Sequence, residues 1–183
     1  MVKLTTFLTL IIFSINSYSS ESNASKIVDS LFMVELSVNG ALTRLSADLG
    51  DMPEKEIGLN CFTTEVTPKL KSYFTDTLVN SLDSDTLKQG AYLSGQTGVR
   101  NSKEFILASD LAKEAKSKGI RADVYMFYMA SKEADTPLAQ KELLDTSNWL
   151  KANGPVYSKQ WVGTIKQYFS IVQDSIGACF VME

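Results

Sequence analysis

The chain of 183 residues has no histidine, only two cysteines and only four prolines. Without histidine it cannot contain a Ser-His-Asp or Cys-His catalytic set, a histidine metal site or a histidine pH switch. Its formal net charge of −3 gives no electrostatic reason to expect nucleic acid as a partner. The remaining composition is ordinary, with 44% hydrophobic and 21% charged residues, and the length suits one globular domain.

The first nineteen residues have the order of a secretory signal peptide. Lys3 gives a short positive region, Leu4–Phe13 is apolar, and small residues precede a cleavage point after Ser19. The apolar run is about half of the ~20 residues that a membrane-spanning helix needs. We therefore expect a signal peptide over residues 1–19 and a periplasmic or secreted mature domain over residues 20–183, without a transmembrane segment. The alternative is an uncleaved N-terminal anchor.

Export changes the interpretation of Cys61 and Cys179, the two cysteines of the chain. In an oxidising compartment they form the only possible intramolecular pair. A bond that closes a loop of about a hundred residues removes ~4–5 kcal/mol of unfolded-state entropy in the chain-entropy model. The sequence therefore predicts a disulfide that ties the last helix to the first half of the chain. The alternative is two buried free thiols.

Apolar residues recur every three or four positions along most of the mature chain, which is typical of amphipathic helices. The sequence predicts an all-α single domain of about six helices and one disulfide, without internal repeats. The segment Val124–Met129 is apolar on every side and fits either a buried helix or a short strand. The expected helices cover residues 26–49, 68–82, 83–94, 101–118, 137–153 and 156–178, with a less defined short helix over residues 54–67.

Local signals suggest where several of these helices begin and end. Thr67-Pro68 and Thr136-Pro137 each place a capping residue before a proline at the first helical position. Asn101 followed by Glu104 resembles a capping box at the start of another helix. Gly119 follows a lysine-rich last turn, as helix C-termini prefer.

Known catalytic motifs are absent from the sequence. No Ser-x-x-Lys, G-x-S-x-G or complete phosphate-binding loop occurs, although Gly95–Gly98 resembles a fragment of such a loop. The alternative interpretation of Gly95–Gly98 is a turn that ends a helix. The acid pairs Asp83/Asp85 and Glu133/Asp135 are the remaining catalytic candidates. Both pairs lie beside predicted helix starts, so helix capping is the alternative for each of them.

Large aromatic residues are concentrated in the second half of the chain, and most of them are expected in the core because of their area. Tyr and Trp also carry binding energy at protein interfaces. An acidic, histidine-free exported domain with surplus aromatic residues therefore fits a binding protein better than an enzyme. The residues concerned are Tyr125, Phe127, Tyr128, Trp149, Tyr157, Trp161, Tyr168 and Phe169.

Two segments, Leu82–Leu87 and Ala91–Gly98, predict a helix that begins with acidic residues and ends in an aromatic-x-Ser element. Together with the export signal and the helices before it, this layout resembles the DUF2059 family of exported bacterial helical proteins. A second placement of the element uses Phe127–Ser131, and both placements stay open. The resemblance implies an α-helical exported domain and assigns no activity.

Export, small size, acidity and one disulfide also resemble the periplasmic immunity proteins that occlude antibacterial effectors, since an acidic surface speeds encounter with basic targets. We therefore expect a protein-binding protein that is not an enzyme and needs no cofactor or metal. Its partner would be an effector or a related envelope protein. One alternative is a small-molecule or lipid carrier with an apolar cavity near residues 124–129. Another is a secreted hydrolase that uses carboxylates alone, with Asp83 and Glu133 as candidates.

Overall fold

The computed structural model describes residues 19–154 and 165–180 of the chain. Almost all of the predicted signal peptide, and residues 156–164 of the predicted last helix, lie outside these ranges. Ten helical segments and no strand occur in the described part, which confirms the all-α prediction. No helix in these ranges is both long and apolar enough to span a membrane.

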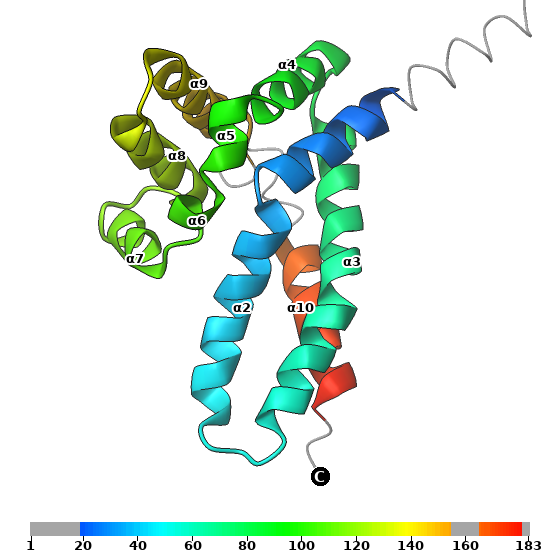
Figure 1. Ribbon diagram of the computed structural model, residues 1–183. Helices are drawn as coiled ribbons and strands as arrows, with labels where there is room; N and C mark the ends of the chain where they lie inside the picture. Colours follow the sequence, from blue (N-terminus) through cyan, green and yellow to red (C-terminus); the bar gives the residue numbers. More distant parts are fainter. Residues whose placement is uncertain (1–18, 155–164, 181–183) are drawn as a thin grey trace, which may run out of the picture.

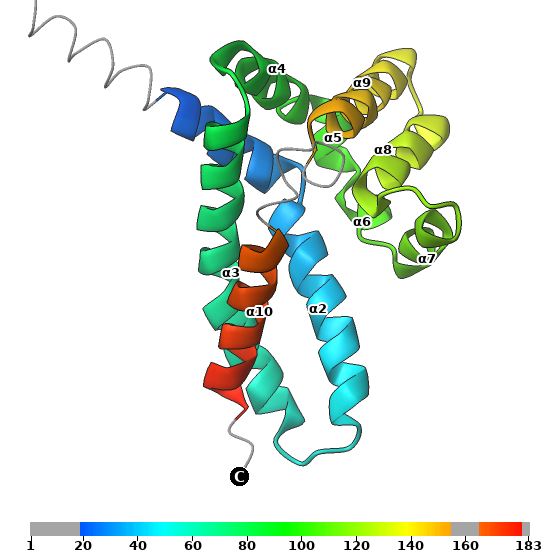
Figure 2. The ribbon, with the colours of Figure 1, turned by 180° about the vertical axis from the view of Figure 1, so that it is seen from behind.

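The helices form two groups (Figures 1 and 2). In the first group, α2 (Met33–Leu49) and α3 (Lys55–Ser81) make a long hairpin, and α10 (Ile165–Cys179) packs along α3. A helix over residues 19–30 precedes α2 and crosses the upper end of this hairpin. The second group consists of α4 (Ser84–Ser94), α5 (Thr97–Asn101), α6 (Lys103–Ile106), α7 (Ser109–Ser117), α8 (Ala122–Glu133) and α9 (Pro137–Asn153).

One hydrophobic cluster extends through both groups. The first described helix supplies Ala24 and Ile27, the hairpin supplies Phe62 and Leu70, and the second group supplies fully buried side chains such as Phe127. Residues a few positions after the predicted cleavage point therefore belong to the core. Burial of this apolar area is the main favourable contribution to folding.

The prediction of about six helices is wrong in number, first because the helix expected over residues 26–49 is interrupted. Leu31 and Phe32 lie in a turn, and Phe32 has the left-handed backbone conformation with φ 55°. Such a conformation costs roughly 1–2 kcal/mol for a residue with a side chain. Burial of Leu31 and Phe32 in the core offsets that cost. Because apolar residues keep the helical spacing on both sides of the turn, the spacing alone could not reveal the interruption.

The opposite error occurs at Thr67-Pro68, which was predicted to start a helix. Pro68 lies inside α3, which continues from Lys55 to Ser81. A proline inside a helix removes one hydrogen bond and costs ~3 kcal/mol. Val66 and Leu70, on either side of it, are both fully buried, so packing of the continuous helix outweighs the local cost.

The helix predicted over residues 101–118 is also wrong, because three short helices occupy this region. Asn101 ends α5 and does not cap a helix, α6 lasts for one turn, and α7 begins at Ser109 without a side-chain cap. The turns between these helices bring Val99 and Ile106 into the core, where both are fully buried.

Other boundary predictions are confirmed. The Asp83 carboxylate accepts hydrogen bonds from the N–H groups of Asp85 and Thr86 at the start of α4 (3.0 and 2.8 Å). Thr136 accepts from the N–H of Ala139 at 3.2 Å, with Pro137 at the first position of α9. Gly119 has φ 65°, as a helix-terminating glycine requires.

The two structural questions left open by the sequence are settled. Val124–Met129 is helical and lies within α8, where Val124, Met126 and Phe127 are buried. Cys61 on α3 and Cys179 at the end of α10 form the predicted disulfide, with 5.6 Å between their Cα atoms. Beside the bond, the Phe180 ring packs directly on Gly58, leaving no room for a side chain at that position.

Candidate functional site

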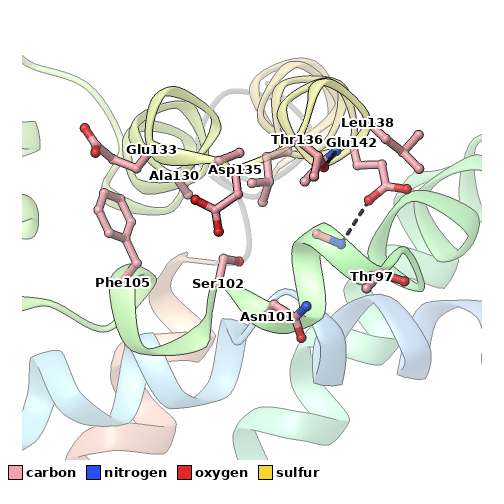
Figure 3. A pocket seen from close by; sticks show the side chains of 14 residues that line it. Thr97, Asn101, Ser102, Phe105, Ala130, Glu133, Asp135, Thr136, Leu138 and Glu142 are labelled. Carbon is pink, nitrogen blue, oxygen red and sulfur yellow. Dashed lines mark hydrogen bonds between the residues drawn. The ribbon is translucent and has the colours of Figure 1, made fainter.

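A pocket of about 520 Å³ lies between the short helices α5 and α6 and the corner that joins α8 to α9 (Figure 3). This volume is within the roughly 300–1,000 Å³ typical of small-molecule sites. The pocket is lined by Thr97, Gly98, Asn101, Ser102, Phe105, Ala130, Glu133, Ala134, Asp135, Thr136, Leu138, Ala139, Glu142 and Leu143.

One wall of the pocket is set by the end of α8 and the capped start of α9. Helix α8 ends at Glu133, and Thr136 caps α9 three residues later. This tight corner places Glu133 and Asp135 at the pocket. Figure 3 shows the Asp135 carboxylate directed across the pocket toward Ser102, with Glu133 near the Phe105 ring.

The opposite wall depends on the close approach of α5 to α9. The N–H of Gly98 donates a 2.9 Å hydrogen bond to Glu142 Oε2, so this carboxylate caps α5 from a different helix. A side-chain carbon on Gly98 would lie 3.1 Å from the Cα atom of Ala139, which is closer than packed carbon atoms prefer. Glycine is therefore needed to bring the two helices together.

The charges in the pocket have one sign. Three carboxylates line it, from Glu133, Asp135 and Glu142, and the described lining includes no lysine or arginine. Glu142 is held by Gly98, whereas Glu133 and Asp135 form no hydrogen bond or ion pair with other residues in the described ranges. Both acids are exposed, and the Asp135 carboxylate is the one directed into the pocket, whereas the Glu133 carboxylate is turned outward (Figure 3).

The sequence-predicted acid pairs are not brought together. Glu133 and Asp135 line the pocket, but Asp83 and Asp85 do not. The hydrogen bonds from the backbone and the hydroxyl of Thr86 lower the pKa of Asp83 below its usual value, so it serves α4 as a helix cap. Within the described ranges, no group of three or more acidic or cysteine side chains is placed to hold a metal ion.

The phosphate-loop fragment Gly95–Gly98 has a structural explanation. Gly95 follows the last residue of α4, and the N–H of Gly98 already binds the Glu142 carboxylate. A phosphate at this position would meet a negative charge at hydrogen-bond distance. The segment ends one helix and starts another, as the helix-stop alternative requires.

A second pocket, also of about 520 Å³, opens between α2 and α3. Val34, Val38 and Leu42 form its apolar side, and an exposed ion pair of 2.8 Å between Lys71 and Asp29 crosses its edge. Neither of the two pockets is lined by any residue from 124–129. The segment proposed for a lipid cavity instead contributes side chains to the packed core.

The predicted aromatic set divides between core and surface. Tyr125, Phe127 and Trp149 are buried, whereas Tyr128 and Phe169 are exposed. Tyr157 and Trp161 lie outside the described residues. Tyr168 packs near Tyr73 and Phe74 of α3, with ring centroids 6.4 and 6.5 Å apart.

The sequence did not predict that two large side chains, one of which lines the first pocket, are exposed. Tyr92 on α4 is 69% exposed, and Leu138 on α9, which lines the pocket, is 67% exposed. Lys141 lies one helical turn after Leu138 and forms a 2.7 Å ion pair with Asp145, whose carboxylate raises the pKa of Lys141. We call Tyr92, Leu138 and Lys141 the Tyr92–Leu138 patch.

A sequence signal for the patch did exist. On α4 the buried residues Leu87 and Leu93 define the inner face, and Tyr92 falls outside it. On α9, Leu138 lies outside the face that buries Leu143 and Leu150. Apolar residues displaced from the helical period are candidates for a contact surface.

Comparison with known protein-family models, curated proteins and solved structures finds no match for this chain. The resemblance to DUF2059 therefore stays a prediction, and the function has to be argued from the geometry.

Proposed function

We propose that this chain is an exported protein-binding protein that acts as an immunity or inhibitor protein, covering the working surface of an antibacterial effector or a related envelope partner. The observation that carries the proposal is the Tyr92–Leu138 patch at the edge of an acid-lined pocket. Tyr92 and Leu138 are exposed on two helices that pack against each other, α4 and α9, and tyrosine is enriched among the residues that carry binding energy at interfaces. The acidic pocket beside them complements a basic partner and speeds its encounter.

The composition of the chain supports binding over catalysis. It has no histidine, and the acids proposed for a carboxylate hydrolase are divided between a helix cap and the pocket. Occlusion of a partner needs only a fixed surface. The two helices that carry the patch are held in place by well-packed contacts, because the Trp149 ring of α9 lies directly on Gly90 of α4.

The proposal is tested by affinity capture with three forms of the mature protein immobilised at equal density. The wild type is compared with Tyr92→Ser/Leu138→Ser and with the control Ile57→Ser, which removes a side chain that is 73% exposed at the start of α3. An extract of the exported proteins of the producing cell is passed over each. We expect one protein to be retained by the wild type and the control, and its affinity to fall roughly ten-fold or more for the double variant.

The retained protein is then identified and expressed with and without this chain. An inhibitor is expected to abolish its toxicity or enzymatic activity in proportion to complex formation. Retention by all three forms alike, or loss with Ile57→Ser alone, would refute the assigned surface. Absence of any retained protein would refute the proposed function.

A further inference from the structure

We propose that the acid-lined pocket between α5, α6, α8 and α9 receives an arginine side chain of the partner. This inference rests on the proposed function, because it takes the ligand to be a side chain of a protein partner. It goes further by naming the chemical group that the pocket selects and the residues that select it.

The first argument is the balance of charge around the cavity. Glu133 and Asp135 have no partner among the described residues, and the described lining contains no basic group. Three lysines next to lining residues in the sequence have interactions elsewhere: Lys103 lies 5.8 Å from the Phe32 ring centroid, Lys132 lies 5.1 Å from that of Tyr128, and Lys141 forms a 2.7 Å ion pair with Asp145. A cation that enters the pocket would therefore not displace a cation of this chain.

The second argument is the shape and chemistry of the lining. The Phe105 ring forms one side of the cavity and the Asp135 carboxylate projects into it from the other (Figure 3). A planar guanidinium can stack on an aromatic ring while it donates two parallel hydrogen bonds to a carboxylate. An ammonium group is a compact point charge and cannot make both interactions equally well.

The third argument is the position of the pocket beside the Tyr92–Leu138 patch. Leu138 belongs to both, since it lines the pocket and is largely exposed. Protein interfaces commonly combine an aromatic or aliphatic contact with an arginine anchored in an adjacent pocket. A partner that covers the patch would bring its own side chains to the mouth of the cavity.

The test uses N-acetyl-arginine methylamide as a probe, titrated into the isotope-labelled mature protein at low salt and followed by amide NMR shifts. The neutral isostere N-acetyl-citrulline methylamide and the corresponding lysine derivative are titrated in parallel. We expect the arginine probe to shift the amides of Thr97, Gly98 and Ala130 selectively. The citrulline probe is expected to bind roughly ten-fold or more weakly, because it lacks the charge, and the lysine probe more weakly than arginine.

Two variants with the same change in net charge provide the control. Asp135→Asn removes the carboxylate in the pocket, whereas Asp48→Asn removes an exposed carboxylate on α2, away from it. We expect Asp135→Asn to weaken arginine binding roughly ten-fold and Asp48→Asn to leave it unchanged. Equal effects of the two variants, equal binding of arginine and citrulline, or equal binding of arginine and lysine would overturn the inference.

The two proposals fail separately. The titration uses small probes and no protein partner. If no probe binds the pocket, the arginine inference is refuted, whereas the result of the capture experiment with Tyr92→Ser/Leu138→Ser still decides the proposed function. Conversely, selective binding of the arginine probe without any captured protein would support an arginine-binding pocket and refute the inhibitor function.

Discussion

At the scale of single residues, the clearest electrostatic arrangement joins α7 to α8. The Tyr125 hydroxyl donates a 2.6 Å hydrogen bond to Glu114 Oε1, and Lys118 lies 3.3 Å from the same oxygen and 5.7 Å from the centroid of the Tyr125 ring. The hydrogen bond from Tyr125, and then the one from Lys118, lowers the pKa of Glu114. The same bond to Glu114, followed by burial, raises the pKa of Tyr125.

These shifts predict the pH dependence of stability. The stabilisation from ionised Glu114 is present above its ordinary pKa of 4.5 and is lost as the pH falls through the lowered folded value. The stabilisation from protonated Tyr125 is present below 10.0 and is lost as the pH rises through the raised folded value. Glu114→Gln and Tyr125→Phe should each lower the thermal midpoint at pH 7. The gap between wild type and Glu114→Gln should narrow below pH 4.5, and a gap that widens there would contradict this account.

At the scale of helices, glycine has different functions at Gly98 and Gly40. Gly98 brings α5 against α9, where an added carbon would lie 3.1 Å from Ala139 Cα. Gly40 lies on the exposed side of α2, where an added carbon would meet nothing within 4 Å. Helix propensity favours alanine at both positions by up to about 1 kcal/mol. The two positions therefore differ only in how closely other atoms pack against the added carbon.

The matched substitutions Gly98→Ala and Gly40→Ala should therefore change stability in opposite directions. Overpacking of the α5–α9 contact costs about 1–3 kcal/mol, which leaves Gly98→Ala destabilised by about 1 kcal/mol after the gain in propensity. Gly40→Ala should be more stable than the wild type by up to about 1 kcal/mol. The midpoints of urea denaturation measure both values. Stabilisation by Gly98→Ala would show that α5 does not approach α9 as closely as described.

The helical elements were predictable where one local cause fixes a boundary. Asp83 and Thr136 cap the helices that follow them, and Gly119 ends one, as expected from short-range chemistry. Phe32 and Pro68 were not predictable, because distant packing decides their conformation. The core accepts a left-handed phenylalanine and a proline within a helix, and neither requirement is visible in a window of neighbouring residues.

The candidate site was predictable in part. Glu133 and Asp135 were identified from the sequence as an acid pair, and the structure places both at a pocket. Their combination with Phe105 and Glu142 depends on the return of the chain from α6 through α7 and α8 to α9. Such contacts between distant residues follow from the arrangement of helices in the core, which periodicity alone does not specify.

At the scale of the whole molecule, the Cys61–Cys179 bond joins residues that are 118 positions apart. It fixes α10 against α3 in addition to their apolar packing. Cys61→Ser/Cys179→Ser should lower the free energy of unfolding by about 4–5 kcal/mol in the chain-entropy limit. Urea denaturation should show that a reductant destabilises the wild type and leaves the double variant unchanged. A wild type that is insensitive to complete reduction would refute this stabilisation.

The predicted export signal gives a second test at this scale. Expressed in a bacterium with residues 1–19 present, the protein should be recovered from the periplasm with Ser20 as its first residue. Intact mass spectrometry of the purified protein measures this directly. A chain that keeps residues 1–19, or that stays in the cytoplasm with both thiols reduced, would contradict the predicted processing and location.

The long span of the disulfide has a consequence for biosynthesis. Cys61 leaves the ribosome 118 residues before its partner, so the crosslink cannot close until the whole segment from Cys61 to Cys179 has been made. A prematurely terminated product that ends before Cys179 keeps a free thiol on α3 and lacks the contact of Phe180 with Gly58. The native bond therefore distinguishes chains that include Cys179 from chains that end before it, and quality-control proteases and thiol oxidoreductases would encounter these two populations as chemically different substrates.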